Sequence, residues 1–267
     1  RGVDQLLGDQ AVSALEDARG TYDGLFGGGP NHPIVLDIFP TASRFTAASG
    51  LPPKSVQTTN VIALSKWTRL LVTSPRALSR GYGWKDTVAH EYIHLVVAVR
   101  TQNRAPVWLQ EGLAKHLEGW WRNDTDSGLG VHHQSLLADA VVKDAFVPFE
   151  KFARSMAYLD SSEEAALAFA QVSTMVQFLL ERAGTESLPL PMDRVRDGEE
   201  AYAVVADLAG FLNWDAFHSE WKVWVRTLPL VDQKLTSLPV VLDGGGDEFD
   251  SDPLLAGRPD LARFTRL

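Results

Sequence analysis

The chain has 267 residues, of which 45% are hydrophobic and 22% are charged, and this balance is typical of a globular protein. Its formal net charge of -9 argues against a general binding surface for nucleic acids or anionic membranes. Because there is no cysteine, disulfides, thiolate metal ligands and cysteine nucleophiles are excluded. No apolar run reaches the roughly 20 residues that a membrane-spanning helix needs.

The first half of the chain predicts a small sheet with helices packed on it. Apolar residues recur at helical spacing over residues 3–26, and "GGGP" at 27–30 ends that pattern. The next elements predicted are a strand at 33–39, a short helix or loop at 41–49 closed by Gly50, strands at 60–65 and 69–74, a helix at about 85–100 and, after Pro106, a helix at 107–121. The strand at 69–74 is expected to be a sheet edge where an extended peptide can lie.

After Trp121 the sequence predicts a loop at 122–130 and then only helices. These helices are expected at 134–144, 163–183, 199–211 and 214–227. The fold class is therefore α+β, with an N-terminal subdomain at 1–121 and a helical subdomain at 122–230. Residues 231–267 are expected to be a linker, acidic and glycine-rich at 242–253, and the start of a helical region that the chain end cuts off.

The start of the chain bears on its location. It begins at Arg1 rather than at Met, which is compatible with a leader that has been removed. The cell envelope or secretion is then favoured over the cytoplasm, although the lack of cysteine leaves the compartment open.

The segment "TVAHEYIHLVVAV" at 87–99 is almost entirely apolar, yet it contains His90, Glu91 and His94. Ionisable groups are costly to bury unless they are paired or bound. Residues four apart on a helix share a face, so His90 and His94 can hold one zinc ion. Glu91 can then take a proton from the water that the metal activates. The alternative, two surface histidines on an amphipathic helix, fits poorly because the flanking residues are apolar on all sides.

A catalytic zinc site needs a third protein ligand and an open fourth position, and Glu111 is the best candidate. The short connection at 101–106 places the two helices side by side. His94 lies ~9 Å before the end of its helix and Glu111 lies ~8 Å after Pro106, so their side chains are expected at matching heights. Gly112 allows the backbone beside the ligand to approach closely. The alternative is a solvated glutamate paired with Lys115.

The segments "HEYIH" and "PVWLQEGLA", with a spacer of 16 residues between His94 and Glu111, resemble the gluzincin metallopeptidases. The chain looks closest to bacterial peptidase-MA-like domains, and "AFAQVSTMVQFLLERAG" at 168–184 resembles their later helix. The resemblance covers about 1–228 and is specific for 86–119. It implies a zincin-like fold, one zinc ion held by His90, His94 and Glu111, and Glu91 as the base. It also implies that a tetratricopeptide-like region follows the chain end.

Two positions depart from the pattern of the domains that the chain resembles. His116 stands where they carry an aromatic residue, often tyrosine, and Phe169 stands where the later helix usually has tyrosine. Phe169 cannot donate a hydrogen bond to an oxyanion, which affects catalytic efficiency more than metal binding. His116 points some 140° away from Glu111 around the helix at ~100° per residue. Tyr158, in a less constrained connection, is therefore the predicted oxyanion donor.

Other candidate residues predict structural roles. His132 and His133 are expected to be exposed loop histidines. His218 and Tyr202 are expected to pack within the structure, with Asn213 capping the last helix. No G-x-S-x-G elbow and no phosphate-binding glycine pattern occurs.

The sequence predicts a zinc-dependent peptidase that acts on a peptide or protein substrate. The absence of a G-x-M-E-N-like exopeptidase motif favours an endopeptidase. The alternative is a non-catalytic, peptidase-like binding or scaffold module that retains the metal site. A base at Glu91 favours the enzyme, because a structural zinc site has no use for it, whereas Phe169 favours the module.

Overall fold

The central element of the fold is helix α4 (Trp84–Thr101), which is buried on most of its faces, as its apolar sequence predicts. A computed structural model describes residues 3–53, 56, 61–66, 68–79, 81–125, 129–156 and 159–231. Arg1–Gln233 form one compact unit, and Lys234–Leu267 lie outside the described residues. The predicted linker and truncated helix at 231–267 therefore lie outside the described residues, except for residue 231. The division into subdomains at Trp121 stays a prediction.

A mixed three-stranded sheet forms one layer of the N-terminal half. It comprises β1 (Val35–Phe39), β2 (Ala63–Lys66) and β3 (Arg69–Thr73), in the order β1-β3-β2. β3 pairs in parallel with β1 and antiparallel with β2, so the prediction of an edge strand at 69–74 is wrong. Leu70, Leu71 and Val72 are all buried, and such a continuous apolar run suits a central strand that is covered on both faces.

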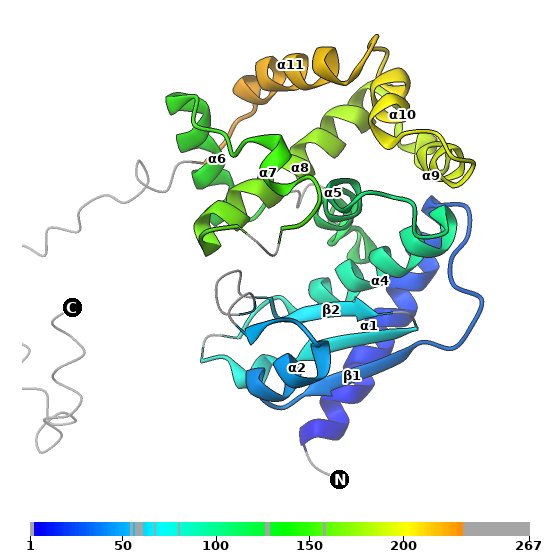
Figure 1. The fold of residues 1–267 in the computed structure, drawn as a ribbon. Helices are drawn as coiled ribbons and strands as arrows, with labels where there is room; N and C mark the ends of the chain where they lie inside the picture. Colours follow the sequence, from blue (N-terminus) through cyan, green and yellow to red (C-terminus); the bar gives the residue numbers. More distant parts are fainter. Residues whose placement is uncertain are drawn as a thin grey trace, which may run out of the picture. The chain divides into compact units, whose positions relative to one another are not determined.

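Helices cover the two faces of this sheet (Figure 1). Leu70 and Val72 pack with Leu95 of α4 on one face, where α1 (Val3–Leu25) also packs against α4. Leu71 packs on the other face with Phe45 of α2 (Ala42–Ser49). The segment at 41–49, for which the sequence predicts a short helix or a loop, thus forms a helix. Thr41 caps it by accepting the Arg44 N–H, and Gly50 ends it with a left-handed φ of 73°.

The C-terminal half is helical and is built around α8 (Ser162–Ala183). Its other helices are α6 (Val131–Lys143), α7 (Phe149–Phe152), α9 (Pro189–Arg196), α10 (Ala201–Leu208) and α11 (Trp214–Trp224), with 3-10 turns at Thr185–Ser187 and Val225–Thr227. Earlier in the chain lie α5 (Val107–Leu117) and 3-10 turns at Pro75–Ala77 and Trp120–Arg122. α5 and α6 pack against α8, which joins the two halves through α5 and α4.

Two differences from the predicted helices affect the interpretation of the site. α9 was not predicted because two prolines obscure its pattern, yet Pro189 and Pro191 lie in the first turn, where the backbone N–H has no partner within the helix. α6 begins three residues earlier than expected, directly after Gly130. His132 and His133 therefore belong to the first turn of a helix, not to a loop. The predicted α+β class is confirmed. None of the helices in the described ranges is long and apolar enough to cross a membrane.

Candidate metal centre

Helix α4 carries His90, Glu91 and His94 on a rigid support. The helix is held between β2, β3, α1, α5 and α9. Val88, Ile93 and Val97 are fully buried or nearly so, which fixes the rotation of the helix about its axis. The two histidines, one turn apart, consequently face the same side.

Helix α5 supplies Glu111 and is pressed against α8. Gly112, the residue after Glu111, lies so close to α8 that an added Cβ would be 2.8 Å from the Val172 carbonyl oxygen and 2.9 Å from Val176 Cγ2. No larger residue fits there without a shift of one helix. The close contact fixes the position of the backbone from which Glu111 extends.

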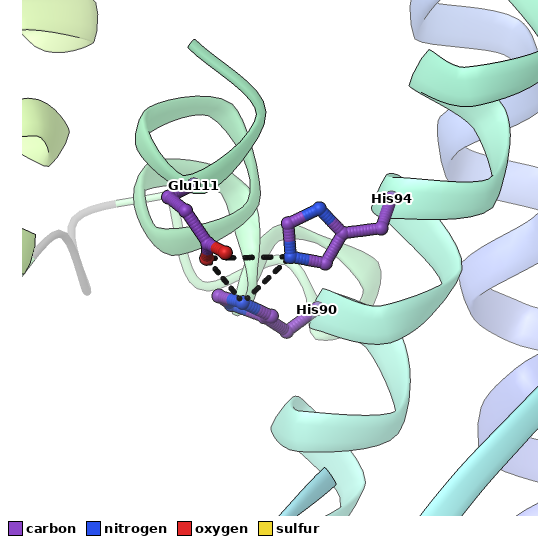
Figure 2. Close-up of side chains that lie close together, drawn as sticks. All are labelled: His90, His94 and Glu111. Carbon is purple, nitrogen blue, oxygen red and sulfur yellow. Dashed lines mark hydrogen bonds and ion pairs between the residues drawn. The ribbon is translucent and has the colours of Figure 1, made fainter. Parts of the chain in front are cut away.

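The three side chains converge on one point (Figure 2). His90 Nε2 lies 3.2 Å from His94 Nε2, and Glu111 Oε2 lies 3.5 Å from the former and 3.3 Å from the latter. The side chains of His90, His94 and Glu111 are only 14%, 11% and 21% exposed. Such a set of two imidazole nitrogens and a carboxylate oxygen can hold a metal ion.

A second carboxylate orients His90 through Nδ1, the ring nitrogen that does not face the other two potential ligands. Glu118 Oε2 lies 3.2 Å from His90 Nδ1, and its other oxygen accepts a hydrogen bond from Lys115 Nζ at 2.5 Å. In the neutral ring, with Nδ1–H donating to Glu118, Nε2 keeps its lone pair for a metal. Lys115 thus pairs with Glu118 rather than with Glu111, which removes the solvated-pair alternative for Glu111.

The charges of the site are mutually stabilising. Burial lowers the pKa of His90, but the hydrogen bonds and negative charges of Glu111 and Glu118 outweigh it and raise that pKa well above its usual range. Burial raises the pKa of Glu111, yet the two histidines hold it well below its usual range. The carboxylate is therefore ionised at neutral pH, as a metal ligand must be.

Comparison with known proteins agrees with this geometry. A family model for the Peptidase MA superfamily matches residues 20–227, which is more than half of the chain. The chain belongs to the Peptidase MA superfamily. No curated protein and no solved structure gives a significant match. Membership confirms the predicted zincin-like fold and shows that this is a peptidase-like domain.

Glu91 is the buried acid of this Peptidase MA domain. Its carboxylate lies near the backbone N–H of Ser65 in β2, which favours the ionised form and lowers the pKa of Glu91. Only 6% of the residue is exposed. Burial raises the pKa of Glu91, and the positive charges of His94 and His90 oppose that rise. A carboxylate with a raised pKa is a stronger proton acceptor than one with the ordinary pKa.

A cleft of about 510 Å³ gives access to Glu91 and the three converging side chains. β2 borders it on the sheet side, and Val107, Met156 and Phe169 line it from the helical half. Its size suits an extended peptide segment. Phe169, at the position where the resemblance predicts tyrosine, thus lies on the cleft wall but cannot donate a hydrogen bond.

Of the other residues singled out in the sequence, His133 lines the cleft and His116 does not. His116 is buried, with its ring centroid 5.9 Å from that of Trp120. Tyr158 lies outside the described residues, so its predicted role stays a prediction. His133 does line the cleft, and the expectation that it is an exposed loop residue is wrong.

The structural roles predicted for three residues of the helical half are confirmed. His218 stacks between Trp214 and Trp221, Tyr202 stacks on Trp108, and Asn213 caps α11 by accepting the Ala216 N–H.

Sequence analysis missed Glu118. The available signal was its spacing, because residues seven apart on a helix return to nearly the same face. Glu118 lies seven residues after Glu111 and therefore lies on the metal side of α5. Lys115, between them, shares that side and lines the cleft.

Proposed function

We propose that this Peptidase MA domain is a zinc-dependent peptidase of the gluzincin type. One observation carries the proposal: His90, His94 and Glu111 meet in a cleft, and the buried carboxylate of Glu91 lies in the same cleft. A purely structural metal site needs the first three residues only. The presence of an ionisable acid, buried at a cost and placed beside the ligands, supports catalysis.

The ligand set fits zinc in particular. Tetrahedral coordination with bonds of about 2.0–2.2 Å separates neighbouring ligand atoms by about 3.3–3.6 Å. The observed separations are 3.2, 3.3 and 3.5 Å. Two imidazoles and one carboxylate are ligands that zinc accepts, and three protein ligands leave a fourth position open. Zinc bound here would act as a Lewis acid that polarises the substrate carbonyl and makes water more acidic.

The residues of the chain divide the proton transfers between them. Glu91 takes one proton from the attacking water, whose oxygen forms a bond to the peptide carbonyl carbon, and the π electron pair of the carbonyl moves onto its oxygen. When the tetrahedral species collapses, the C–N bond breaks and Glu91 returns that proton to the leaving nitrogen. Glu118 holds His90 in the orientation that the metal site requires.

Strand β2 offers a docking edge for an extended substrate. The Ile62 carbonyl accepts the Thr73 N–H at 2.8 Å. In this antiparallel pair the backbone N–H and C=O groups of the even-numbered residues of the segment therefore point toward β3, and those of Ala63 and Ser65 point away from it. Ala63 and Ser65 line the cleft. A peptide added along this edge has its backbone carbonyls beside the ligand cluster without needing a free end, which favours an endopeptidase.

Substitution of Glu91 by glutamine tests the enzyme proposal. Gln is nearly isosteric and cannot accept the proton, so hydrolysis of an unstructured protein substrate should fall about 10²–10⁴-fold while zinc stays bound. Glu16→Gln, on an exposed face of α1, is the matched control and should cleave normally. His94→Ala should abolish tight zinc binding, and Glu111→Ala should weaken it severely. Equal cleavage by Glu91→Gln and the wild-type protein would refute the role of Glu91.

The second candidate function is a non-catalytic binding module. Phe169 favours it, because this cleft residue lacks the hydroxyl of the tyrosine expected at that position. A zinc-loaded wild-type protein that binds a peptide hydroxamate but cleaves no unstructured protein would establish the module and exclude the peptidase.

A further inference from the structure

His133 is a polar side chain in the cleft that the proposed reaction has not yet used. It is the third residue of α6 and is partly buried on the cleft wall. Lys115 and Glu118 lie close enough to influence its charge. His133 therefore lies on the side of the cleft where Glu118 contacts His90.

Two observations exclude the ordinary roles of such a histidine. Its ring does not belong to the group of potential ligand atoms within 4.8 Å of one another, so it is not a fourth metal ligand. Within the described ranges, no hydrogen bond joins the His133 ring to another residue. A partly buried imidazole without such a partner has a free donor to offer to something that enters the cleft.

The orientation of the ring indicates which of its two nitrogens can face the cleft. A Cβ added to Gly130, the N-cap of α6, would lie 4.0 Å from His133 Nδ1. Nδ1 thus turns back toward the start of its own helix. Nε2, on the far side of the ring, is the atom that can face the cleft.

The surroundings keep the imidazole neutral. Burial lowers the pKa of His133 to about 4, and the positive charge of Lys115 contributes in the same direction. The N-terminal end of α6 also disfavours a positive charge. A neutral imidazole carries one N–H, and in the tautomer protonated on Nε2 that N–H is available to a group in the cleft.

We propose that His133 is a further catalytic residue, whose Nε2–H donates a hydrogen bond to the carbonyl oxygen of the scissile peptide bond. The proposal rests on the peptidase function. As the water oxygen bonds to the carbonyl carbon and the π pair moves onto the carbonyl oxygen, the hydrogen bond from His133 stabilises the new negative charge. His133 keeps its proton throughout, and Glu91 alone carries the proton from water to the leaving nitrogen. His133 thus supplies from α6 the donor that Phe169 lacks on α8.

The test compares His133→Ala and His133→Gln with His132→Ala. His132 is the exposed neighbour in the same helical turn and serves as the matched control. All three variants should retain one zinc per chain. Removing an oxyanion donor lowers kcat about 10²–10³-fold with little change in KM. His133→Gln keeps an N–H donor and should recover part of that loss, whereas His132→Ala should match the wild-type protein.

Binding of inhibitors separates this proposal from the peptidase proposal itself. A phosphinic peptide mimics the tetrahedral oxyanion, and a peptide hydroxamate binds the metal without that mimicry. His133→Ala should weaken binding of the phosphinic peptide about 10²-fold or more and leave hydroxamate binding unchanged. A wild-type protein that cleaves nothing would overturn the peptidase function, but the two inhibitors would still report on His133.

Three results would overturn the role of His133. One is unchanged binding of the phosphinic peptide by His133→Ala. Another is loss of zinc from His133→Ala, which would assign the residue to the metal site. The third is a loss of phosphinic-peptide affinity in Tyr158→Phe but not in His133→Ala, which would return the donor role to Tyr158.

Discussion

Gly112→Ala tests whether the close packing of α5 on α8 positions the metal ligand. The added Cβ would lie 2.8 Å from the Val172 carbonyl oxygen, a backbone atom that cannot rotate away. Overpacking of this kind costs about 1–3 kcal/mol, whereas replacing a helical glycine by alanine contributes about 1 kcal/mol of stability. We therefore expect a net change between zero and a loss of about 2 kcal/mol.

Gly20→Ala in α1 is the matched control. A Cβ there meets no atom within 4 Å, so the variant should gain up to about 1 kcal/mol from helix propensity alone. The difference between the two variants isolates the steric cost at Gly112, and it should be about 1–3 kcal/mol. Urea denaturation of the metal-free proteins measures both free energies of unfolding.

Metal binding completes this test. If α5 moves away from α8, Glu111 moves relative to His90 and His94, so Gly112→Ala should bind zinc more weakly than Gly20→Ala in competition with a chromophoric chelator. The reasoning fails if Gly112→Ala gains as much stability as Gly20→Ala and binds zinc with the wild-type affinity.

Two further substitutions follow from the electrostatics of α5. Glu118→Gln should lower zinc affinity about 10–100-fold by weakening the hydrogen bond that orients His90, and an unchanged dissociation constant at pH 7 would contradict that role. His116→Leu should make the metal-free protein less sensitive to acid. Burial lowers the pKa of His116 to about 4 from 6.5, so the unfolded chain takes up a proton between those values that the folded chain does not. The resulting stability is fully present above pH 6.5 and is lost as pH falls toward 4, amounting to about 3 kcal/mol at about 1.4 kcal/mol per pH unit. Denaturation curves at pH 7 and 4.5 that shift equally for both proteins would contradict it.

The cluster of potential metal ligands could be predicted from the sequence because its arrangement depends on local geometry. The positions of His90 and His94 relative to each other are fixed by one helical turn. Glu111 depends on one short connection between two adjacent helices, which leaves few relative heights for its side chain. The α+β class followed for a similar reason, since helical and strand periodicity each report the burial pattern of one segment.

The order of the strands and the membership of the cleft were decided only by tertiary structure. Periodicity reports that Leu70, Leu71 and Val72 are apolar, but their central position depends on α2 and α4 covering opposite faces of β3. His133 could not be assigned to the cleft, because α6 is separated from α4 and α5 by a loop whose path no local pattern fixes. Its place depends on the packing of α6 against α8, which brings together residues far apart in the sequence. Local rules thus determined the groups that can bind the metal, and long-range packing decided which other side chains face them.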